Sequence, residues 1–418
     1  MSLVYIDHKK CCPWCKECVP RCMIEGWTSG NNDVDKFIKY TNYNAKNNKC
    51  LEWIPYDRFE GVEQIAKGGF SKVYSATWID GKANYFKQDD GSWKRRETGS
   101  IRVALKKLNE SQNISAEYLN ELKIHWRFYI TATSPLRLYG ITKDPQTKEL
   151  IMVTQLIDQG NLRRILLNNF NNMFWRDKLL LLTKIVIDLK NLHDIGYSHK
   201  DLHSGNILRG RSATFIADFG LSGPSNEQKS NDKIYGVLPY IAPEVLNRKP
   251  YTLSSDIYSI GVIMTELSSG KSPFYERKHD LSLALEICSG IRPKFGKGTP
   301  EIYKKLANRC MDVNPDQRPK TGELFEILMF WYNACDNNEY NQEKEKFGYK
   351  EKEIKVVFDE ADKEIPNIST LYEINPDAIY TSRVFTNSNL PNPINSSYLD
   401  ENSIDCQDSK LPYLEIPN

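Results

Sequence analysis

The order in which strand-like and helix-like runs follow one another limits the folds open to this chain more than any other feature. In residues 61–79 and 101–108, apolar and polar residues alternate as they do in strands. One helical run, 115–128, interrupts the strands, and from Asn161 onward the apolar spacing is predominantly helical. Strands first and helices second predict an α+β fold with two segregated lobes and a cleft between them.

Composition divides the chain into three parts. We expect a Cys-rich leader that ends in a short amphipathic helix with Val34, Phe37 and Ile38 on one side, then one large domain, then a polar tail. The predicted boundaries are 1–55 for the leader, 56–335 for the domain with lobes at 56–157 and 158–335, and 336–418 for the tail.

The tail differs from the rest of the chain in charge. From Asp336 onward there are 17 acidic and 8 basic residues, a net charge of −9, which leaves +11 for residues 1–335 from a total of +2. Low hydrophobicity predicts mostly disorder here, except for a helical stripe at 351–365 that docks on the body. The opposite charges also suggest that the tail folds onto the body and restrains it.

The sequence also favours some partners and places over others. No apolar run approaches the roughly 20 residues of a membrane span, and the N-terminus lacks the apolar stretch of a signal peptide. We therefore expect an intracellular, cytoplasmic protein whose ten cysteines are thiols. Because no Lys/Arg run is interleaved with aromatic residues, ATP and acidic partners are favoured over nucleic acid. Oligomeric state is left open.

The stretch SHKDLHSGNIL, residues 198–208, carries the strongest chemical signal. Phosphoryl transfer from ATP needs the phosphates and their magnesium held in line with an acceptor hydroxyl. Asp201 can orient that hydroxyl and accept its proton, while Asn206 can hold a magnesium ion. Twelve residues after Asn206, the sequence ADFG offers Asp218 as the main magnesium ligand.

Two further features suit the phosphates of ATP. The turn AKGGFSKV, residues 66–73, keeps Gly68 and Gly69 in a hairpin where backbone N–H groups can approach phosphate oxygens. Lys106, at the end of VALK, can hold the phosphates if a carboxylate pairs with it. Glu121 and Glu117 lie about one helical turn apart on about the same face, and either could supply that carboxylate.

Taken in order, these motifs and the later APE at 242–244 resemble a eukaryotic protein-kinase domain over about 280 of the 418 residues. The resemblance implies ATP and Mg²⁺ as cofactors, protein substrates, and a hinge that follows a small gatekeeper, Thr154. It implies Glu121, by its spacing and its NE context, as the partner of Lys106. It also implies a buried ion pair of Glu244 with Arg318, and Asp256 as a cap on the catalytic-loop backbone. The implied nucleotide and metal contacts are Ile65, Ala66, Gly68, Gly69, Val73, Ala104, Lys106, Thr154, Gln155, Ile157, Asn206, Leu208 and Asp218.

Specificity follows from details of the same motifs. The segment GVLPYIAPE resembles Ser/Thr kinases, while the hinge and residues 256–267 look tyrosine-kinase-like. The mixture resembles the tyrosine-kinase-like group, and the leader resembles an expanded fungal family in it. His203 replaces a Lys near the γ-phosphate and can still donate one hydrogen bond. Lys200 replaces an Arg that binds phosphate, so control by phosphorylation should be weaker.

Two functions are compatible with this pattern. Because Lys106, Asp201, Asn206 and Asp218 are all present, we expect an active kinase that modifies Ser/Thr and also itself. The alternative is a pseudokinase scaffold that binds nucleotide or partners without catalysis. Candidate modified residues in the segment after Asp218 are Ser222, Ser225, Ser230 and Tyr235.

The leader holds a separate cysteine cluster. Cys12, Cys15, Cys18 and Cys22 have the spacing of a ferredoxin run, but no second run exists and Met follows the last Cys. Zinc, with His8 or Cys50 as a further ligand, is a second reading, and unliganded thiols are a third.

Overall fold

The computed structural model describes most of the chain and divides into two compact units. Unit 1 comprises residues up to Gln159 together with Arg209–Arg211 and Ala217–Gly223, and unit 2 comprises the remainder. The described residues are 27–44, 49–69, 71–87, 89, 93–96, 98–108, 116–211, 213–225, 233–336, 345–385 and 392–395.

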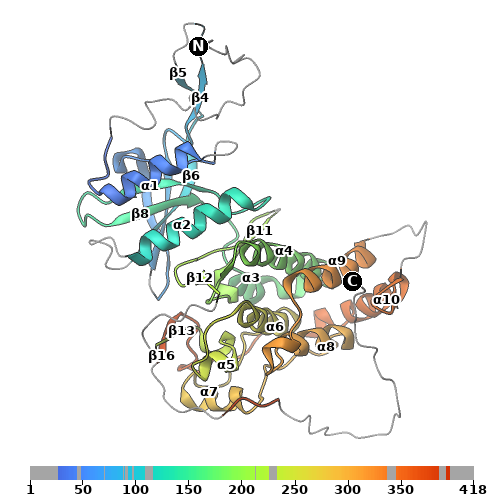
Figure 1. Ribbon diagram of the computed structural model, residues 1–418. Coiled ribbons are helices and arrows are strands. Elements are labelled where there is room, and N and C mark those ends of the chain that lie inside the picture. The colour runs from blue at the N-terminus through green and yellow to red at the C-terminus, as the bar shows by residue number, and fades with distance from the viewer. Residues whose placement is uncertain are drawn as a thin grey trace, which may run out of the picture. The chain divides into compact units, whose positions relative to one another are not determined.

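Unit 1 is built on one six-stranded sheet (Figure 1). Its strand order is β1-β7-β8-β6-β3-β2, in which β1 pairs in parallel with β7 and all other neighbours are antiparallel. The polar excursion between β3 and β6 contains a further hairpin of β4 and β5. The strands are β1 (Glu52–Trp53), β2 (Phe59–Lys67), β3 (Ser71–Trp78), β4 (Asn84–Lys87), β5 (Trp93–Arg96), β6 (Ile101–Leu108), β7 (Leu138–Lys143) and β8 (Leu150–Gln155).

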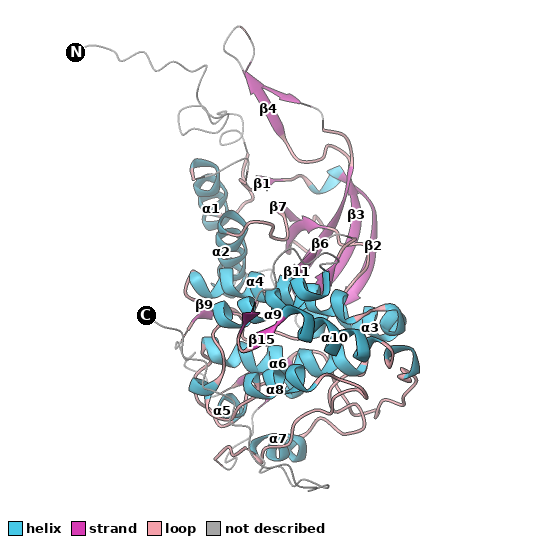
Figure 2. Cartoon of the chain, turned by 90° about the vertical axis from the view of Figure 1, so that its right-hand side faces the viewer, coloured by secondary structure: helices cyan, strands magenta, loops and turns pink. Residues whose placement is uncertain are grey.

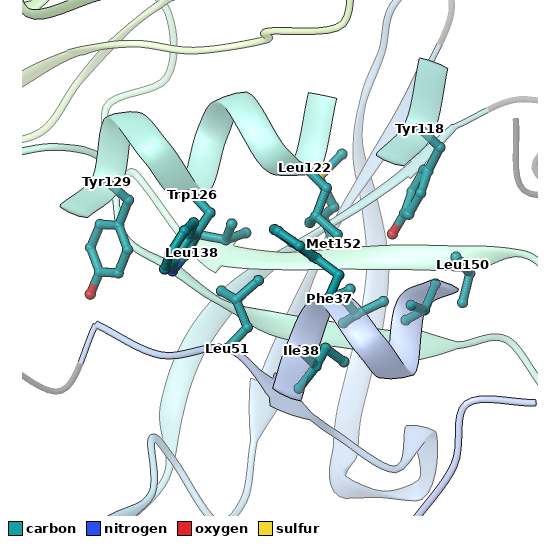
Figure 3. Close-up of a cluster of buried hydrophobic side chains, with 12 residues drawn as sticks. Phe37, Ile38, Leu51, Tyr118, Leu122, Trp126, Tyr129, Leu138, Leu150 and Met152 are labelled. Carbon is teal, nitrogen blue, oxygen red and sulfur yellow. The ribbon is translucent and has the colours of Figure 1, made fainter. Parts of the chain in front are cut away.

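Two helices cover one face of this sheet. Helix α1 (Asn32–Tyr43) begins at Asn31, whose side chain accepts from two backbone N–H groups, and α2 (Ala116–Thr131) follows β6. Phe37 of α1 meets Trp126 of α2 edge to face at 6.0 Å (Figure 3). The end of the leader therefore shares a hydrophobic core with the sheet and α2.

The other face of the sheet carries a second core. Trp78, Phe59 and Tyr139 pack there with Val103 and Leu105 of β6, and Trp78 is 1% exposed. Successive residues of a strand point to opposite faces of the sheet, and residues two apart share a face. Val103 and Leu105 therefore face this core, while Ala104 and Lys106 face the side of α2. Both faces of β6 are thus fixed by packing.

Unit 2 is predominantly helical (Figure 2, where helices are cyan). Helix α6 is buried along almost its whole length and packs against α8, while α4 packs against α9. The helices are α3 (Leu162–Asn169), α4 (Trp175–Asp194), α5 (Pro243–Leu246), α6 (Leu253–Ser269), α7 (Leu281–Cys288), α8 (Glu301–Cys310), α9 (Thr321–Asp336) and α10 (Glu351–Asp362).

Short strands and 3-10 turns complete the described part of unit 2. Strands β10 and β11 form a two-stranded sheet, as do β14 and β15, and β13 pairs with β16. Their bounds are β9 (Tyr197–Ser198), β10 (Ile207–Arg209), β11 (Thr214–Ile216), β12 (Gly223–Pro224), β13 (Ile234–Gly236), β14 (Glu345–Lys346), β15 (Tyr349–Lys350) and β16 (Arg383–Phe385).

The ion pair expected from the sequence is present in unit 2. Arg318 Nη1 and Nη2 donate to Glu244 Oε1 and Oε2 over 2.8 and 2.7 Å. Both residues are buried, and the two parallel bonds match the planar guanidinium to the carboxylate. This pair ties α5 to the turn that precedes α9.

The segment for which the sequence predicts mostly disorder contains folded elements in its described part. Phe358 of α10 is 1% exposed and packs between Trp175 and Trp331, with ring centroids 5.5 and 5.7 Å away. Buried aromatic area of this kind outweighs the polar composition of the surrounding segment. Helix α10 lies inside the stretch 351–365 that carries a helical stripe.

The sheet of unit 1 and the helices of unit 2 give the α+β architecture that the sequence predicts. Among the helices of the described residues, none is long and apolar enough to cross a membrane.

Candidate functional site

Strand β6 places Lys106 on the same face of the sheet as other predicted nucleotide contacts. Lys106 lies opposite Val73 of β3, and Ala104 lies opposite Thr154 of β8. Because cross-strand partners and positions two apart share a face, these four side chains point to the same side. The sheet therefore gathers predicted contacts that are up to 81 positions apart in the sequence.

Lys106 lies between two carboxylates of unit 1. Its Nζ donates to Glu121 Oε1 of α2 over 2.5 Å and to Asp218 Oδ1 over 2.7 Å. The side chain of Glu121 is 2% exposed, whereas that of Asp218 is 37% exposed. The structure thus brings three predicted site residues together, and Glu121 supplies the carboxylate.

The two carboxylates determine the charge of Lys106. Burial alone favours the neutral amine of Lys106, but the carboxylates of Asp218 and Glu121 outweigh it and raise the pKa of Lys106. Lys106 is therefore an ammonium at neutral pH. An ammonium held in this way can bind phosphate oxygens. Asp218 is exposed enough to bind a metal ion in place of its contact with Lys106.

Phe219 anchors the backbone that carries Asp218. Its ring is 1% exposed and packs against His125 and Phe128 of α2, with ring centroids 5.2 and 5.3 Å away. Asp218 itself has a φ of +67°, a backbone region that non-glycine residues rarely adopt. Packing of the neighbouring residue therefore holds Asp218 in a strained conformation beside Lys106.

The glycine turn joins β2 and β3. Gly68 N donates to Ser71 O over 2.8 Å, which closes the hairpin. Of the predicted contacts here, Ile65 is 52% exposed, and Ala66 and Gly69 are also exposed. A turn of this kind leaves backbone N–H groups near the surface of unit 1, as a phosphate cover requires.

The predicted hinge follows β8. Thr154 is 8% exposed, and Gln155 N donates to Arg137 O over 2.9 Å. Strand β8 ends at Gln155, so Ile157 lies in the irregular segment beyond it. An irregular backbone at this point is free of the sheet ladder, which is the condition for it to bind adenine.

The catalytic loop in unit 2 is positioned by a single carboxylate. Asp256 of α6 accepts from His199 N over 2.8 Å, from Lys200 N over 3.0 Å and from His193 Nε2 over 2.9 Å. This is the backbone cap that the sequence suggests for Asp256. Lys200 has a φ of +67°, so the cap holds the loop in a conformation that the chain would otherwise avoid.

Three predicted residues meet within this loop. Asn206 Nδ2 donates to Asp201 O over 3.0 Å and lies 3.4 Å from Asp201 Oδ2. His203 Nε2 lies 3.7 Å from the same Asp201 oxygen. Asp201 Oδ1 is buried and has no hydrogen-bond partner among the described residues. The amide of Asn206 fixes Asp201, and its own oxygen is the atom suited to a metal ion.

The hydrogen bond to His203 determines which ring nitrogen carries the hydrogen in the neutral imidazole. His203 Nδ1 accepts from Gly205 N over 3.0 Å, so the neutral ring carries its hydrogen on Nε2, next to Asp201. A Cβ on Gly205 would lie 2.7 Å from the imidazole Cε1, which only glycine avoids. His203 thus has a donor directed at the place where the predicted chemistry occurs.

Sequence reasoning missed a buried network beneath the loop. Ser204 Oγ and Tyr240 OH donate to the two oxygens of Glu266, over 2.9 and 2.6 Å. Burial raises the pKa of Glu266 above its usual value, although the positive charge of nearby Arg163 opposes this shift. These residues come from four separated segments without a shared motif, so no local signal points to them. Their contacts tie the loop to α6.

The predicted site residues of each unit are chemically suited to ATP and magnesium. Asp218 of unit 1 and Asn206 of unit 2 each carry a hard oxygen of the kind that Mg²⁺ prefers. Lys106 supplies a point charge suited to phosphate oxygens. Leu208, the remaining predicted contact, is half-buried in β10 of unit 2.

The predicted zinc ligands Cys12, Cys15, Cys18 and Cys22 lie outside the described residues. Within the described ranges no group of three or more His, Cys, Asp or Glu side chains is arranged to hold a metal ion. Cys50, the further ligand considered, is 1% exposed, and its Sγ lies 3.9 Å from Lys82 Nζ.

A lysine on a sheet strand that pairs with two carboxylates, and an Asp–Asn loop in a helical unit, are features of the protein-kinase class. Residues 59–328 match the family model described as protein tyrosine and serine/threonine kinase. The chain belongs to this family.

Similar proteins are known from Dictyostelium discoideum. One, named a probable LIM domain-containing serine/threonine-protein kinase, is 31% identical over 193 residues, which is 46% of this chain and 20% of that protein. Two others, named probable serine/threonine-protein kinases, are 28% identical over 244 residues and 24% identical over 293 residues. These cover 57% and 69% of this chain, and 14% and 30% of the relatives. The chain thus spans less than a third of each of these relatives.

Proposed function

We propose that this chain is an ATP- and magnesium-dependent protein kinase that phosphorylates Ser/Thr hydroxyls in intracellular signalling. The observation that carries the proposal is the position of Lys106 between the carboxylates of Glu121 and Asp218. That arrangement presents one cation and one exposed oxygen ligand to a nucleotide. The names of the relatives and the GVLPYIAPE segment support Ser/Thr specificity.

Each residue has a role in this reaction. Lys106, positioned by Glu121, binds the phosphates, and Asp218 with Asn206 holds magnesium, which when bound neutralises charge on the phosphate oxygens. Asp201 orients the acceptor hydroxyl and takes its proton, while His203 donates from Nε2 to the transferring group. The resemblance to the tyrosine-kinase-like group and its fungal family supports the assignment and does not identify a substrate.

The test is transfer of labelled phosphate from ATP, with magnesium, to the purified chain and to a generic basic protein. We expect label on Ser or Thr, lost in Asp218→Asn and retained in Asp57→Asn. Asp57 is exposed and lies in the same unit, so it controls for the change of charge. Label on Tyr alone would overturn the specificity. ATP binding without any transfer would establish a nucleotide-binding scaffold instead.

A further inference from the structure

A serine far along the chain contacts the carboxylate predicted to be the catalytic base. Ser382 Oγ donates to Asp201 Oδ2 over 2.5 Å, although 181 positions separate the two residues. A hydroxyl from which a base removes a proton must lie within hydrogen-bond reach of that base. Ser382 meets this condition, and both residues lie in unit 2.

The backbone beside Ser382 is held as an added strand. Strand β16 lies beside β13 of the segment between Asp218 and Glu244 (Figure 1). The two strands pair antiparallel, with Tyr235 opposite Val384. Extended peptides commonly bind proteins by adding a strand to an exposed edge in this way. Gly236 of β13 has a φ of +138°, a backbone conformation that glycine adopts readily and other residues rarely do.

Specific contacts hold the residues before Ser382. The Arg163 guanidinium lies over the Tyr380 ring at 4.8 Å, and its Nη1 donates to Tyr380 O over 3.0 Å. Tyr380 OH donates to Pro273 O over 3.0 Å, and the ring of His279 lies edge to face with that of Tyr380. Two polar contacts and two ring contacts therefore seat Tyr380.

A contact also holds the residue after Ser382. Arg383 Nη2 donates to His279 O, and His279 Nδ1 is in hydrogen-bond contact with Ile379 O over 2.9 Å. His279 thus contacts the segment on both sides of Ser382. Thr381, the adjacent hydroxyl, is exposed. The segment presents one particular hydroxyl to Asp201.

We propose that Ser382 is an intramolecular phosphoacceptor and that residues 379–385 occupy the substrate position until Ser382 is modified; this rests on the proposed kinase activity. Ser382 Oγ attacks the γ-phosphorus of ATP and forms the new O–P bond. The bond from that phosphorus to the bridging oxygen breaks, and ADP leaves with the electron pair. The hydroxyl proton passes to Asp201.

Transfer changes the electrostatics of the contact. Phosphoserine carries a charge of about −1.5 to −2 at neutral pH, placed directly beside the Asp201 carboxylate. Like charges at hydrogen-bond distance repel, so the modified segment leaves Asp201 and uncovers the edge of β13. Self-modification therefore opens the site to other proteins.

The test follows label in the phosphatase-treated full chain with magnesium, ATP and a generic basic protein. We expect label at Ser382, with a rate constant that does not change with protein concentration, and a lag before the basic protein is labelled. Ser382→Ala should lose this label and, because phosphate cannot displace its segment, should modify the basic protein only at the slow initial rate. Ser382→Thr should regain label at that position.

Ser369→Ala is the matched control, because Ser369 is an exposed hydroxyl of the same tail. It should leave the label at Ser382 unchanged. Two results with the wild-type chain would overturn the inference and leave the kinase activity standing. One is modification of the basic protein without label at Ser382, and the other is a rate constant for Ser382 labelling that rises with the concentration of the chain. Absence of the lag would overturn the displacement. No transfer to either acceptor would overturn the proposed function and the inference together.

Discussion

In the proposed reaction, Glu121 acts on the nucleotide only through Lys106. It is 2% exposed, and its Oε1 accepts from Lys106 Nζ. Removing the charge of Glu121 leaves Lys106 held by Asp218 alone, and small displacements of a binding group have large effects on rate. Under the proposed function Glu121 is a positioning residue, distinct from Asp201, which is proposed to contact the acceptor.

We predict that Glu121→Gln lowers kcat/KM about 10- to 100-fold, through a loss of orientation of Lys106. The measurement is steady-state phosphorylation of a generic protein at varied ATP concentration. Glu63→Gln, an exposed position of β2, should leave the kinetics unchanged. An unaltered kcat/KM in Glu121→Gln would show that Asp218 alone positions Lys106.

Lys178 of α4 is a buried cation away from the site. Its Nζ has no hydrogen-bond partner among the described residues and lies over the rings of Phe170 and Trp175, at 4.1 and 4.8 Å from the centroids. Burial lowers the pKa of Lys178 to about 7, although the Asp362 carboxylate opposes this. The unfolded chain therefore binds this proton more tightly than the folded chain does.

Between pH 7 and 10.5 the unfolded state holds more protons than the folded state, so Lys178 makes stability rise with pH across that window. Below pH 7 both states are protonated and the burial penalty is constant. We predict that Lys178→Met raises the free energy of unfolding most, relative to the wild type, below pH 7. Its advantage should shrink by up to about 1.4 kcal/mol per pH unit above 7, measured by urea unfolding. A difference that does not vary with pH would contradict the lowered pKa.

At the level of elements, α10 contributes to the core of unit 2. We predict that Phe358→Ala costs about 3–5 kcal/mol in the free energy of unfolding, because it leaves a cavity between Trp175 and Trp331. Val356→Ala, at a residue 59% exposed on the same helix, should change stability by about 0.5 kcal/mol or less. Equal effects of the two changes in chemical denaturation would mean that α10 is not docked in solution.

The elements also show what the sequence can predict. Lys106, Asp201, Asn206 and Asp218 belong to short motifs in a fixed order, and each motif is local, so they could be recognised from the chain alone. Glu121 required only a spacing on one helix. The helical stripe of α10 was visible for the same reason, since its period is local.

Other features were hidden because they depend on distant segments. Ser204, Tyr240 and Glu266 meet only when α6 and the catalytic loop pack together. The contact of Ser382 with Asp201 spans 181 positions, and its short segment has neither period nor motif. The end of the leader joins the core of unit 1 through Phe37, which composition alone assigns to a separate part. Local patterns cannot report such pairings.

For the whole molecule, the C-terminal segment can be removed without removing α10. We predict that deleting residues 373–418 abolishes the lag and raises the initial rate on an external protein several-fold, because the edge of β13 is then uncovered. Deleting only 386–418 leaves β16 in place and should keep the lag. Unchanged initial rates in the longer deletion would show that the segment does not compete with external proteins.

If the proposed activity holds, the pairing of β16 with β13 also sets a condition on any external protein substrate. A tethered segment has an effective concentration that is commonly on the order of millimolar, far above that of most proteins in a cell. An external protein must therefore compete with a segment that remains covalently attached to the chain. Before Ser382 is modified, the apparent KM of the external protein would therefore depend on how often the segment leaves the site. After modification, the KM would reflect the affinity of the external protein alone.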